Sequence, residues 1–266
     1  MIDVLIPTYN RPDALAVTLT ALAFQTDRDF RVIVADQSDE PVERGAAVAT
    51  ALRILGLHGR EPRVVRNLPR RGLAQQRQFL LDEVRAPLCL FLDDDLTLEP
   101  WVVAQLRAAM AEAACGFVGA PCIGLSFEGD ERPHQQAIEW WDGPVQPERI
   151  EREGYGWERY TLHNAANPLH VQRAHGLTPA TSRLYKVAWV GGCVLYDTAK
   201  LRACGGFEFW QDLPSVHAGE DVLAQLRVMA RFGGAGVLPS GVYHQELPTT
   251  VPDREFDAPR VLAIHG

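Results

Sequence analysis

Three adjacent carboxylates offer the clearest chemistry in this sequence. Asp93, Asp94 and Asp95 end the apolar run of "PLCLFLDDDLTLEP". On an extended chain alternate residues share a face, so Asp93 and Asp95 are predicted to point together and Asp94 away. Converging carboxylates need a cation between them or a proton on one of them, and such oxygen ligands suit Mg²⁺ or Mn²⁺. The alternative is an acidic cluster stabilised by the N-terminus of the helix that follows.

Composition is consistent with a cation site and argues against some classes of partner. The chain has 266 residues, 47% of them hydrophobic, and a formal net charge of −8. Its length and apolar content are sufficient for a substantial core. Nucleic-acid and anionic-membrane binding require clustered basic surface, so the acidic balance argues against both.

Cysteine usage and the N-terminus indicate a cytoplasmic protein. The five cysteines are scattered and form no CxxC pair, a pattern typical of free thiols in a reducing compartment. The chain starts "MIDVLIPTYN", with an acid where a signal peptide would be apolar, and no run reaches 18 apolar residues. We therefore expect no transmembrane segment, although peripheral membrane contact remains compatible with the sequence.

Strand and helix patterns alternate four times in roughly the first 115 residues. Continuous apolar strands with helical crossovers predict a mostly parallel α/β sheet covered on both faces. Ligands of such sheets bind outside the carboxyl ends of the strands. Polar residues gather at those ends: Thr8, Tyr9 and Asn10 after the first strand, residues 36–39 after the second, and the three acids after the fourth.

The second half of the chain is less regular. Residues 125–185 show no periodicity and are predicted to be an irregular insertion. A strand and a short helix follow in "YKVAWVGGCVLYDTAKLRACGGF", then the amphipathic helix "GEDVLAQLRVMARFGG" and a last strand "AGVLPSGVYHQE". We expect one domain over 1–247, with halves at 1–120 and 121–247, and a surface arm over 248–266.

Four blocks carry a family resemblance, in the order "VLIPTYNRPDALAVTLTALAFQT", "VIVADQSDE", "RGLAQQRQFLLDEVRAPLCLFLDDDLTLEP" and "GGFEFWQDLPSVHAGEDVLAQLRVMARFG". Together they resemble the family 2 glycosyltransferases, which have the GT-A fold. The blocks cover roughly 1–120 and 186–245 and leave the insertion and the tail unmatched. The resemblance implies a hexosyltransferase-type enzyme with a nucleotide-sugar donor, most commonly a UDP-sugar, a divalent metal and inversion at the anomeric carbon.

On the donor side, the resemblance implies that the first loop grips the nucleotide and that a basic segment faces the diphosphate. Tyr9 could stack on the base and Asp36 could accept a hydrogen bond from the base or ribose, while Asn10 could equally cap the next helix. The segment "NLPRRGLAQQR" ends in Gln76-Arg77-Gln78, where relatives commonly have Ala-Arg-Asn. The implied donor contacts are Pro7, Thr8, Tyr9, Asn10, Arg11, Asp36, Arg71, Gly72, Arg77, Asp94, Gly191 and Gly192.

The resemblance also implies a metal site and a base. Asp93 and Asp95 would bracket Mn²⁺ or Mg²⁺, with His244 as a third ligand. Asp221 would be the base that deprotonates the acceptor hydroxyl, supported by Glu220. The alternative for both acids is stabilisation of a helix N-terminus.

Two other functions remain open at this stage. A nucleotidyltransferase that makes activated sugars would need a glycine-rich first loop, and "IPTYNRP" contains no glycine. A non-catalytic nucleotide-sugar-binding protein would be favoured by loss of Asp221 or the acidic triplet, and both are present. The hydroxyl acceptor, whether glycan, lipid-linked or small molecule, depends on the insertion. Paired Trp140 and Trp141 there could stack on a sugar or anchor the loop.

Overall fold

A computed structural model describes residues 1–251 and 254–264 of the chain. Within these residues the larger sheet has eight strands in the order β3-β2-β1-β4-β8-β6-β9-β7, and a second sheet pairs β10 with β5. The contacts of β1 with β2 and β4, of β2 with β3 and of β6 with β9 are parallel. Strand β8 runs antiparallel to β4 and β6, and β7 runs antiparallel to β9. The predicted α/β fold with a mostly parallel sheet is confirmed.

The strands are β1 (Ile2–Thr8), β2 (Phe30–Asp36), β3 (Pro62–Arg66), β4 (Leu88–Leu92), β5 (Leu96–Leu98), β6 (Phe117–Gly119), β7 (Arg183–Tyr185), β8 (Cys193–Asp197), β9 (Gly234–Leu238) and β10 (Val242–His244). The α-helices are α1 (Pro12–Ala23), α2 (Ala46–Leu57), α3 (Leu73–Asp82), α4 (Val102–Ala113), α5 (Asn167–Ala174), α6 (Thr198–Ala203), α7 (Glu220–Phe232) and α8 (Ala258–Val261). Short 3₁₀ helices are η1 (Val42–Arg44), η2 (Leu125–Phe127), η3 (Pro133–Gln135), η4 (Trp157–His163), η5 (Pro179–Thr181) and η6 (Glu208–Asp212).

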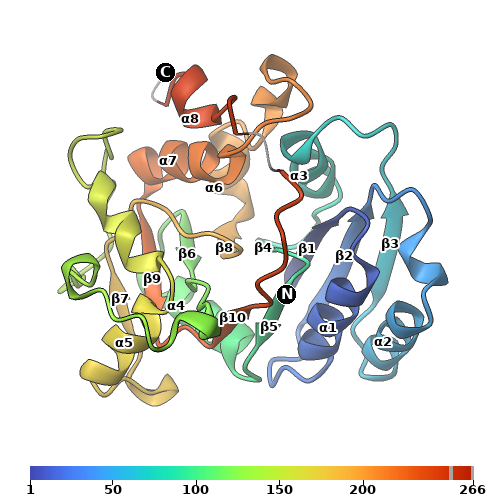
Figure 1. Cartoon of the computed structure of the whole chain (residues 1–266), viewed down its shortest axis with the longest axis horizontal. Coiled ribbons are helices and arrows are strands. Elements are labelled where there is room, and N and C mark those ends of the chain that lie inside the picture. The colour runs from blue at the N-terminus through green and yellow to red at the C-terminus, as the bar shows by residue number, and fades with distance from the viewer. Residues whose placement is uncertain (252–253, 265–266) are drawn as a thin grey trace.

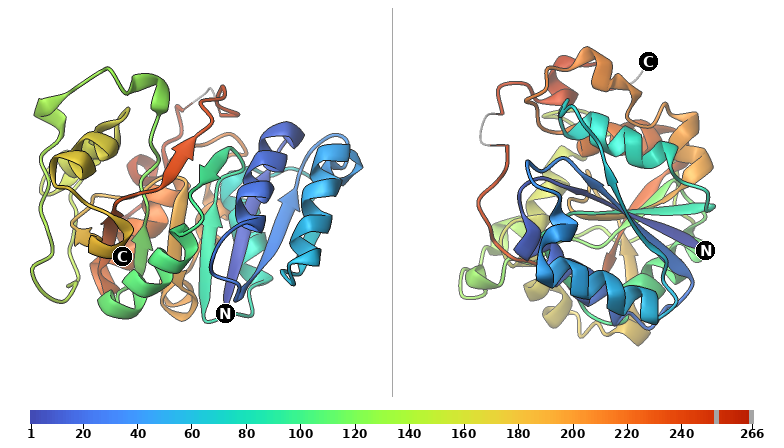
Figure 2. Two further views of the ribbon diagram at one scale, coloured as in Figure 1. Left: turned by 90° about the horizontal axis from the view of Figure 1, so that it is seen from below. Right: turned by 90° about the vertical axis from the view of Figure 1, so that its right-hand side faces the viewer.

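Both faces of the large sheet are buried, as the continuous apolar strands predict. Alternate residues of β1 enter different cores: Val4 and Ile6 pack with α1, α2 and α4, whereas Leu5 packs with α3, α6 and α7. Figure 2 shows α3 on one side of the first strands and α1 and α2 on the other. The sheet therefore lies between two helical layers and opens at the carboxyl ends of its strands.

Two expected elements differ from the observed ones. The single last strand is two strands, β9 and β10, that belong to different sheets; Pro239 and Gly241 lie between them. The sequence period could not show this, because both halves are apolar and the turn is short. Within the insertion, residues 167–174 form helix α5, whose Leu169 and Val171 are buried.

The C-terminal segment is part of the fold. Figure 1 shows it leaving β10, passing the strand ends and reaching α8 next to α7. Ala258 is fully buried, and its backbone N–H donates to the Ala218 carbonyl oxygen at 2.8 Å; the Ala218 N–H donates to the Phe256 carbonyl oxygen at the same distance. The expectation of a surface arm is therefore wrong for this helix; the parts of that arm at 252–253 and 265–266 lie outside the described residues. In the part of the chain that is described, no helix is long and apolar enough to span a membrane.

Candidate active site

A large pocket lies at the carboxyl ends of β1 and β4, with a volume of about 1060 Å³. Two regions far apart in sequence form its walls: the first loop with the acidic triplet, and the start of α7 with the C-terminal segment. The structure brings together here these residues predicted from sequence: Pro7, Thr8, Tyr9, Arg11, Arg77, Asp93, Asp94, Asp95, Glu220, Asp221 and His244.

The acidic triplet forms a turn and not the end of an extended strand. Its side chains therefore do not alternate as the sequence analysis expected. Asp94 and Asp95 both face Arg11, whose Nη1 lies 3.6 Å and 2.7 Å from their carboxylates. Asp93 lines the same pocket but pairs with Arg77, at 3.0 Å. The expectation that Asp93 and Asp95 share a face while Asp94 points away is corrected by this turn.

A buried hydroxyl fixes the turn from below. Thr18 of α1 accepts a hydrogen bond from the Leu96 backbone N–H at 3.1 Å, and its oxygen lies 2.8 Å from the Asp94 carbonyl oxygen. The Asp94 carboxylate in turn accepts a 2.6 Å hydrogen bond from Thr8. Helix α1, strand β1 and the turn are thereby held in one arrangement.

Burial makes part of this triplet hard to ionise. Desolvation, with a contribution from neighbouring Asp95, raises the pKa of Asp94 to about 7 against the lowering effect of the Thr8 hydrogen bond. Desolvation and the charge of Asp93 also raise the pKa of Asp95. A cation beside these carboxylates would offset their desolvation and favour the ionised forms.

Arg77 connects the two halves of the pocket. It is 5% exposed, and its Nε and Nη2 donate to Glu220 and Asp93, each at 3.0 Å. Burial alone would lower the pKa of Arg77, but the carboxylates of Asp93, Glu220 and Asp221 raise it. Arg77 was predicted to face the diphosphate; two of its nitrogens are instead engaged by carboxylates, so it positions both acidic groups.

Glu220 and Asp221 open α7 and face the same pocket. Gly219 precedes them with a left-handed φ of 74°, which turns the chain into the helix. Desolvation first, then the neighbouring Glu220 charge, raises the pKa of Asp221 to about 7. Among the described residues Asp221 forms no ion pair, whereas Glu220 is held by Arg77. A half-buried carboxylate of this kind can accept a proton near neutral pH.

His244 reaches the triplet because β10 pairs with β5, which directly follows it. His244 lies opposite Leu96 in that pairing, and its Nε2 is 3.5 Å from Asp95. Its Nδ1 accepts the Glu246 backbone N–H at 2.8 Å, so Nε2 carries the proton of the neutral ring. Ligation of a metal through Nε2 would require the other tautomer.

Six predicted donor contacts do not line this pocket. Asp36 is fully buried and its carboxylate is occupied by Ser38, Val42 and Arg66. Asn10 is exposed and exchanges hydrogen bonds with Asp39 at 2.8 and 2.9 Å. Arg11 and not Asn10 occupies the N-cap position of α1, and its side chain makes no capping hydrogen bond.

The other four lie behind or beside the pocket. Arg71 is exposed, and a Cβ on Gly72 would lie 2.5 Å from the ring of His217, so this glycine accommodates His217. Gly192 lies behind Asp93, whose backbone N–H donates to its carbonyl oxygen at 2.8 Å, while Gly191 has open space beside it.

Several pocket residues were not identified from the sequence. Arg70 covers the ring of Tyr9 at 3.8 Å, and Trp157 and Trp189 form an aromatic wall with ring centroids 4.7 Å apart. Arg254 and Arg260 of the C-terminal segment also line the pocket. Among these residues only Trp157 lies in a recognisable sequence pattern, "GYGWERY", because aromatic residues in an irregular segment often mark a binding surface. The arginines gave no such signal, because a charged tail usually indicates a solvated surface.

The paired tryptophans of the insertion lie outside this pocket. Trp140 packs against His175 and Tyr185, and Lys186 lies 5.1 Å from the Trp141 ring. The pair could stack on a sugar or anchor the loop by packing, and these contacts agree with the packing role.

Comparisons with known proteins agree with this fold. The family model described as glycosyl transferase family 2 matches residues 3–175, which includes most of the insertion that the sequence blocks left unmatched. An uncharacterised protein of Mycobacterium tuberculosis is 28% identical over 136 residues, 51% of this chain and 40% of that protein.

Solved structures extend the similarity over nearly the whole chain at low identity. TarS residues 1–349 of S. aureus gives a TM-score of 0.56 at 16% identity, covering 91% of this chain and 60% of that one. The mannosyltransferase PcManGT from Pyrobaculum calidifontis, in complex with GDP-Man and Mn²⁺, gives a TM-score of 0.56 at 15% identity, covering 94% of this chain and 58% of that one. GalNAc-T7 with UDP, GalNAc and Mn²⁺ gives a TM-score of 0.62 at 15% identity, covering 92% of this chain and 43% of that one.

This chain therefore spans 60% or less of the length of these relatives, and the structural similarity establishes the GT-A fold. The family match covers more than half of the chain and includes the first loop, the basic segment and the acidic triplet. This chain belongs to glycosyl transferase family 2.

Proposed function

We propose that this protein transfers a hexose from a nucleotide diphosphate sugar to an acceptor hydroxyl, with inversion of the anomeric carbon. The observation that carries the proposal is the Arg77 bridge. It holds Asp93 of the acidic turn and Glu220, next to Asp221, around one pocket of about 1060 Å³. In this proposal the donor would bind on the Asp93 side of that space, and the base would act from the Glu220 side.

The donor side offers cations and an aromatic ring. Arg70, Arg254 and Arg260 line the pocket and form no ion pair within the described residues, so their guanidinium groups can contact phosphate oxygens. The Tyr9 ring is covered by Arg70, so base stacking on Tyr9 would have to use its other face or displace Arg70. We infer uridine as the nucleotide, because UDP-sugars are the commonest donors in the family.

A divalent metal, Mn²⁺ or Mg²⁺, fits the oxygen donors of this site. Asp93 and Asp95 would hold it; in the described residues no three His, Cys, Asp or Glu side chains stand ready to enclose an ion. Such metals commonly take one or two carboxylates and complete their shell with substrate phosphates and water. The metal would supply Lewis-acid stabilisation of the leaving diphosphate. His244 would contact Asp95 as a hydrogen-bond donor.

On the acceptor side Asp221 takes the proton. The acceptor oxygen attacks the anomeric carbon as its proton passes to the Asp221 carboxylate and the bond from that carbon to the diphosphate oxygen breaks. Because one displacement occurs, the configuration inverts. Trp157 and Trp189 border the same space and would pack against the acceptor. A positioned base contributes roughly 10²- to 10⁴-fold in rate.

The test is nucleotide release from UDP-, GDP- and dTDP-sugars with Mn²⁺ and mixed sugar acceptors. We expect a nucleoside diphosphate from one donor, and Asp221→Asn should lower kcat roughly 10²- to 10⁴-fold with little change in donor affinity. Asp142→Asn, which removes an exposed carboxylate that does not line the pocket, serves as the control. Pyrophosphate release from a sugar phosphate and a nucleoside triphosphate would identify a nucleotidyltransferase. Donor binding without turnover, unchanged by Asp221→Asn, would identify a binding protein.

A further inference from the structure

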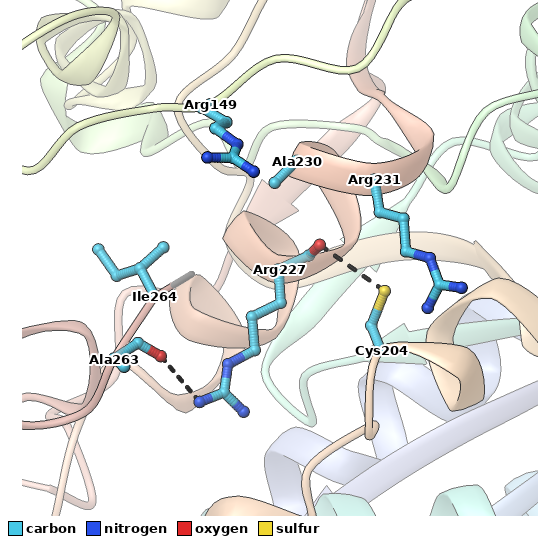
Figure 3. A pocket seen from close by; sticks show the side chains of 7 residues that line it. All are labelled: Arg149, Cys204, Arg227, Ala230, Arg231, Ala263 and Ile264. Atoms are coloured by element: carbon cyan, nitrogen blue, oxygen red, sulfur yellow. Dashed lines mark hydrogen bonds between the residues drawn. The ribbon is translucent and has the colours of Figure 1, made fainter. Parts of the chain in front are cut away.

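A second pocket lies along the C-terminal half of α7, whereas the acidic residues of the active site stand at the N-terminus of that helix. Its volume is about 520 Å³, and we call it the arginine pocket because Arg149, Arg227 and Arg231 line it together with Cys204, Ala263 and Ile264. Figure 3 shows Arg227 reaching toward Ala263, Arg231 beside Cys204, and Arg149 entering from the insertion. Four separate segments of the chain thus meet around three cationic groups.

No carboxylate lines the arginine pocket, and none of its three arginines forms an ion pair in the part of the chain that is described. Arg227 and Arg231 each donate to one backbone carbonyl oxygen, of Ala263 and Ala203, at 2.8 Å. Each guanidinium has five N–H donors, so most of them stay available. This contrasts with the overall acidic chain, whose net charge is −8.

The cluster carries an unfavourable charge that an anion would relieve. Desolvation lowers the pKa of Arg227, and the charge of Asp212 acts in the opposite direction. Arg231 alone could be explained by its position in the last turn of α7, where a cation stabilises the helix C-terminus. Arg149 and Arg227 have no such explanation, since one lies in the insertion and the other in the helix interior.

We propose that the arginine pocket binds a phosphate group, carried either by a soluble phosphate ester or by a lipid headgroup. Planar guanidinium groups pair with phosphate oxygens through two parallel hydrogen bonds, and three of them can neutralise a dianion. The pocket also includes Ala263 and Ile264, which follow the residues that line the active-site pocket, among them Asp257 and Arg260. A bound phosphate would hold this segment against α7.

Cys204 provides a local readout that needs no sugar transfer. It is partly exposed inside the pocket, whereas Cys89, Cys115 and Cys193 are buried. The alkylation rate of Cys204 by the neutral reagent iodoacetamide is measured by peptide mass spectrometry, with inorganic phosphate or with KCl of equal ionic strength. One-site binding predicts about tenfold slower alkylation at ten times the dissociation constant.

Variants separate specific binding from general charge effects. In the double variant Arg227→Gln and Arg231→Gln, phosphate should no longer slow the alkylation of Cys204 relative to KCl. Arg28→Gln with Arg53→Gln removes the same charge from exposed arginines elsewhere and should preserve this protection by phosphate. Arg149→Gln should weaken protection without harming the fold, because that side chain has no hydrogen bond or ion pair within the described residues.

The same alkylation assay with lipid vesicles distinguishes a lipid headgroup from a soluble phosphate ester. Phosphatidylcholine vesicles containing phosphatidic acid are compared with pure phosphatidylcholine. Protection by the anionic vesicles beyond that by dissolved phosphate supports a lipid headgroup, and equal or stronger protection by dissolved phosphate supports a soluble ester. If neither slows alkylation relative to KCl, or if the Arg227 and Arg231 double variant is protected as well as the wild type, the proposal is wrong.

Discussion

Replacement of Arg77 by methionine is the most direct test of how the active site is held together. Methionine fills much of the space but removes the guanidinium that binds Glu220 and Asp93 at 3.0 Å each. The Glu220 side chain is 4% exposed and keeps no other ion-pair partner in the described residues, whereas Asp93 is 38% exposed and can be solvated. Breaking a buried ion pair from one side costs about 3–5 kcal/mol, because the remaining charge is uncompensated.

The cost should depend on pH in a defined direction. A carboxylate that is harder to ionise in the folded than in the unfolded protein destabilises the fold above its unfolded pKa of roughly 4.3 and not below it. We therefore expect the full loss at pH 8 and a clearly smaller loss at pH 5, where proton uptake neutralises the orphaned acid. The assay is the free energy of unfolding from urea titrations at both pH values.

A surface pair provides the comparison. Arg63 pairs with Glu83 but is 52% exposed, so Arg63→Met should cost less than about 1 kcal/mol at either pH. A loss at pH 8 as small as that of Arg63→Met, or one that does not shrink toward pH 5, would refute the view that Arg77 is the structural link between the two acidic groups.

Three further outcomes are expected. Transfer activity should rise with pH and level off above about pH 8, because the pKa of Asp221 is raised to about 7 and the base must be ionised. Asp221→Asn should remove this pH dependence of the activity. The same variant should also have a larger free energy of unfolding at about pH 8, since an acid with a raised pKa destabilises the fold at high pH. A flat profile in the wild type would contradict the assignment. Gly192→Ala should cost about 1–3 kcal/mol of unfolding free energy, because φ is +79° and the new Cβ would lie 2.6 Å from Cys122; Gly191→Ala, with open space, should stay within about 0.5 kcal/mol, and equal costs would refute the steric argument. Removal of divalent metal with EDTA should abolish transfer and Mn²⁺ should restore it, with Mn²⁺ binding to the isolated protein measured by calorimetry; full activity in EDTA would exclude the metal role.

Much of the site could be predicted from short sequence motifs. The carboxyl ends of parallel strands meet at one edge, so Thr8, Tyr9 and the acidic triplet had to lie close together. The helix starting at Glu220 was recognisable from its period, which placed Glu220 and Asp221 in its first turn. These inferences are local, and the family resemblance supplied the link between them.

Other assignments depend on contacts across the fold that the sequence does not show. Asp36 looked like a donor ligand, but Arg66 and two backbone N–H groups occupy its carboxylate. Arg77 looked like a phosphate ligand, but Glu220, 143 residues away, binds its Nε. A side chain's partners at such separations leave no periodic signal in the chain.

The sequence by itself determined the alternation of strands and helices, the burial of both sheet faces and the location of acidic groups at strand and helix ends. These depend on apolar period and on residues next to each other, which are visible in one dimension. Only the tertiary structure decided that the acidic triplet turns, so that Asp94 and Asp95 meet Arg11 while Asp93 meets Arg77. Only it placed the C-terminal segment in the pocket wall, because long-range packing and charge compensation decide which distant groups meet.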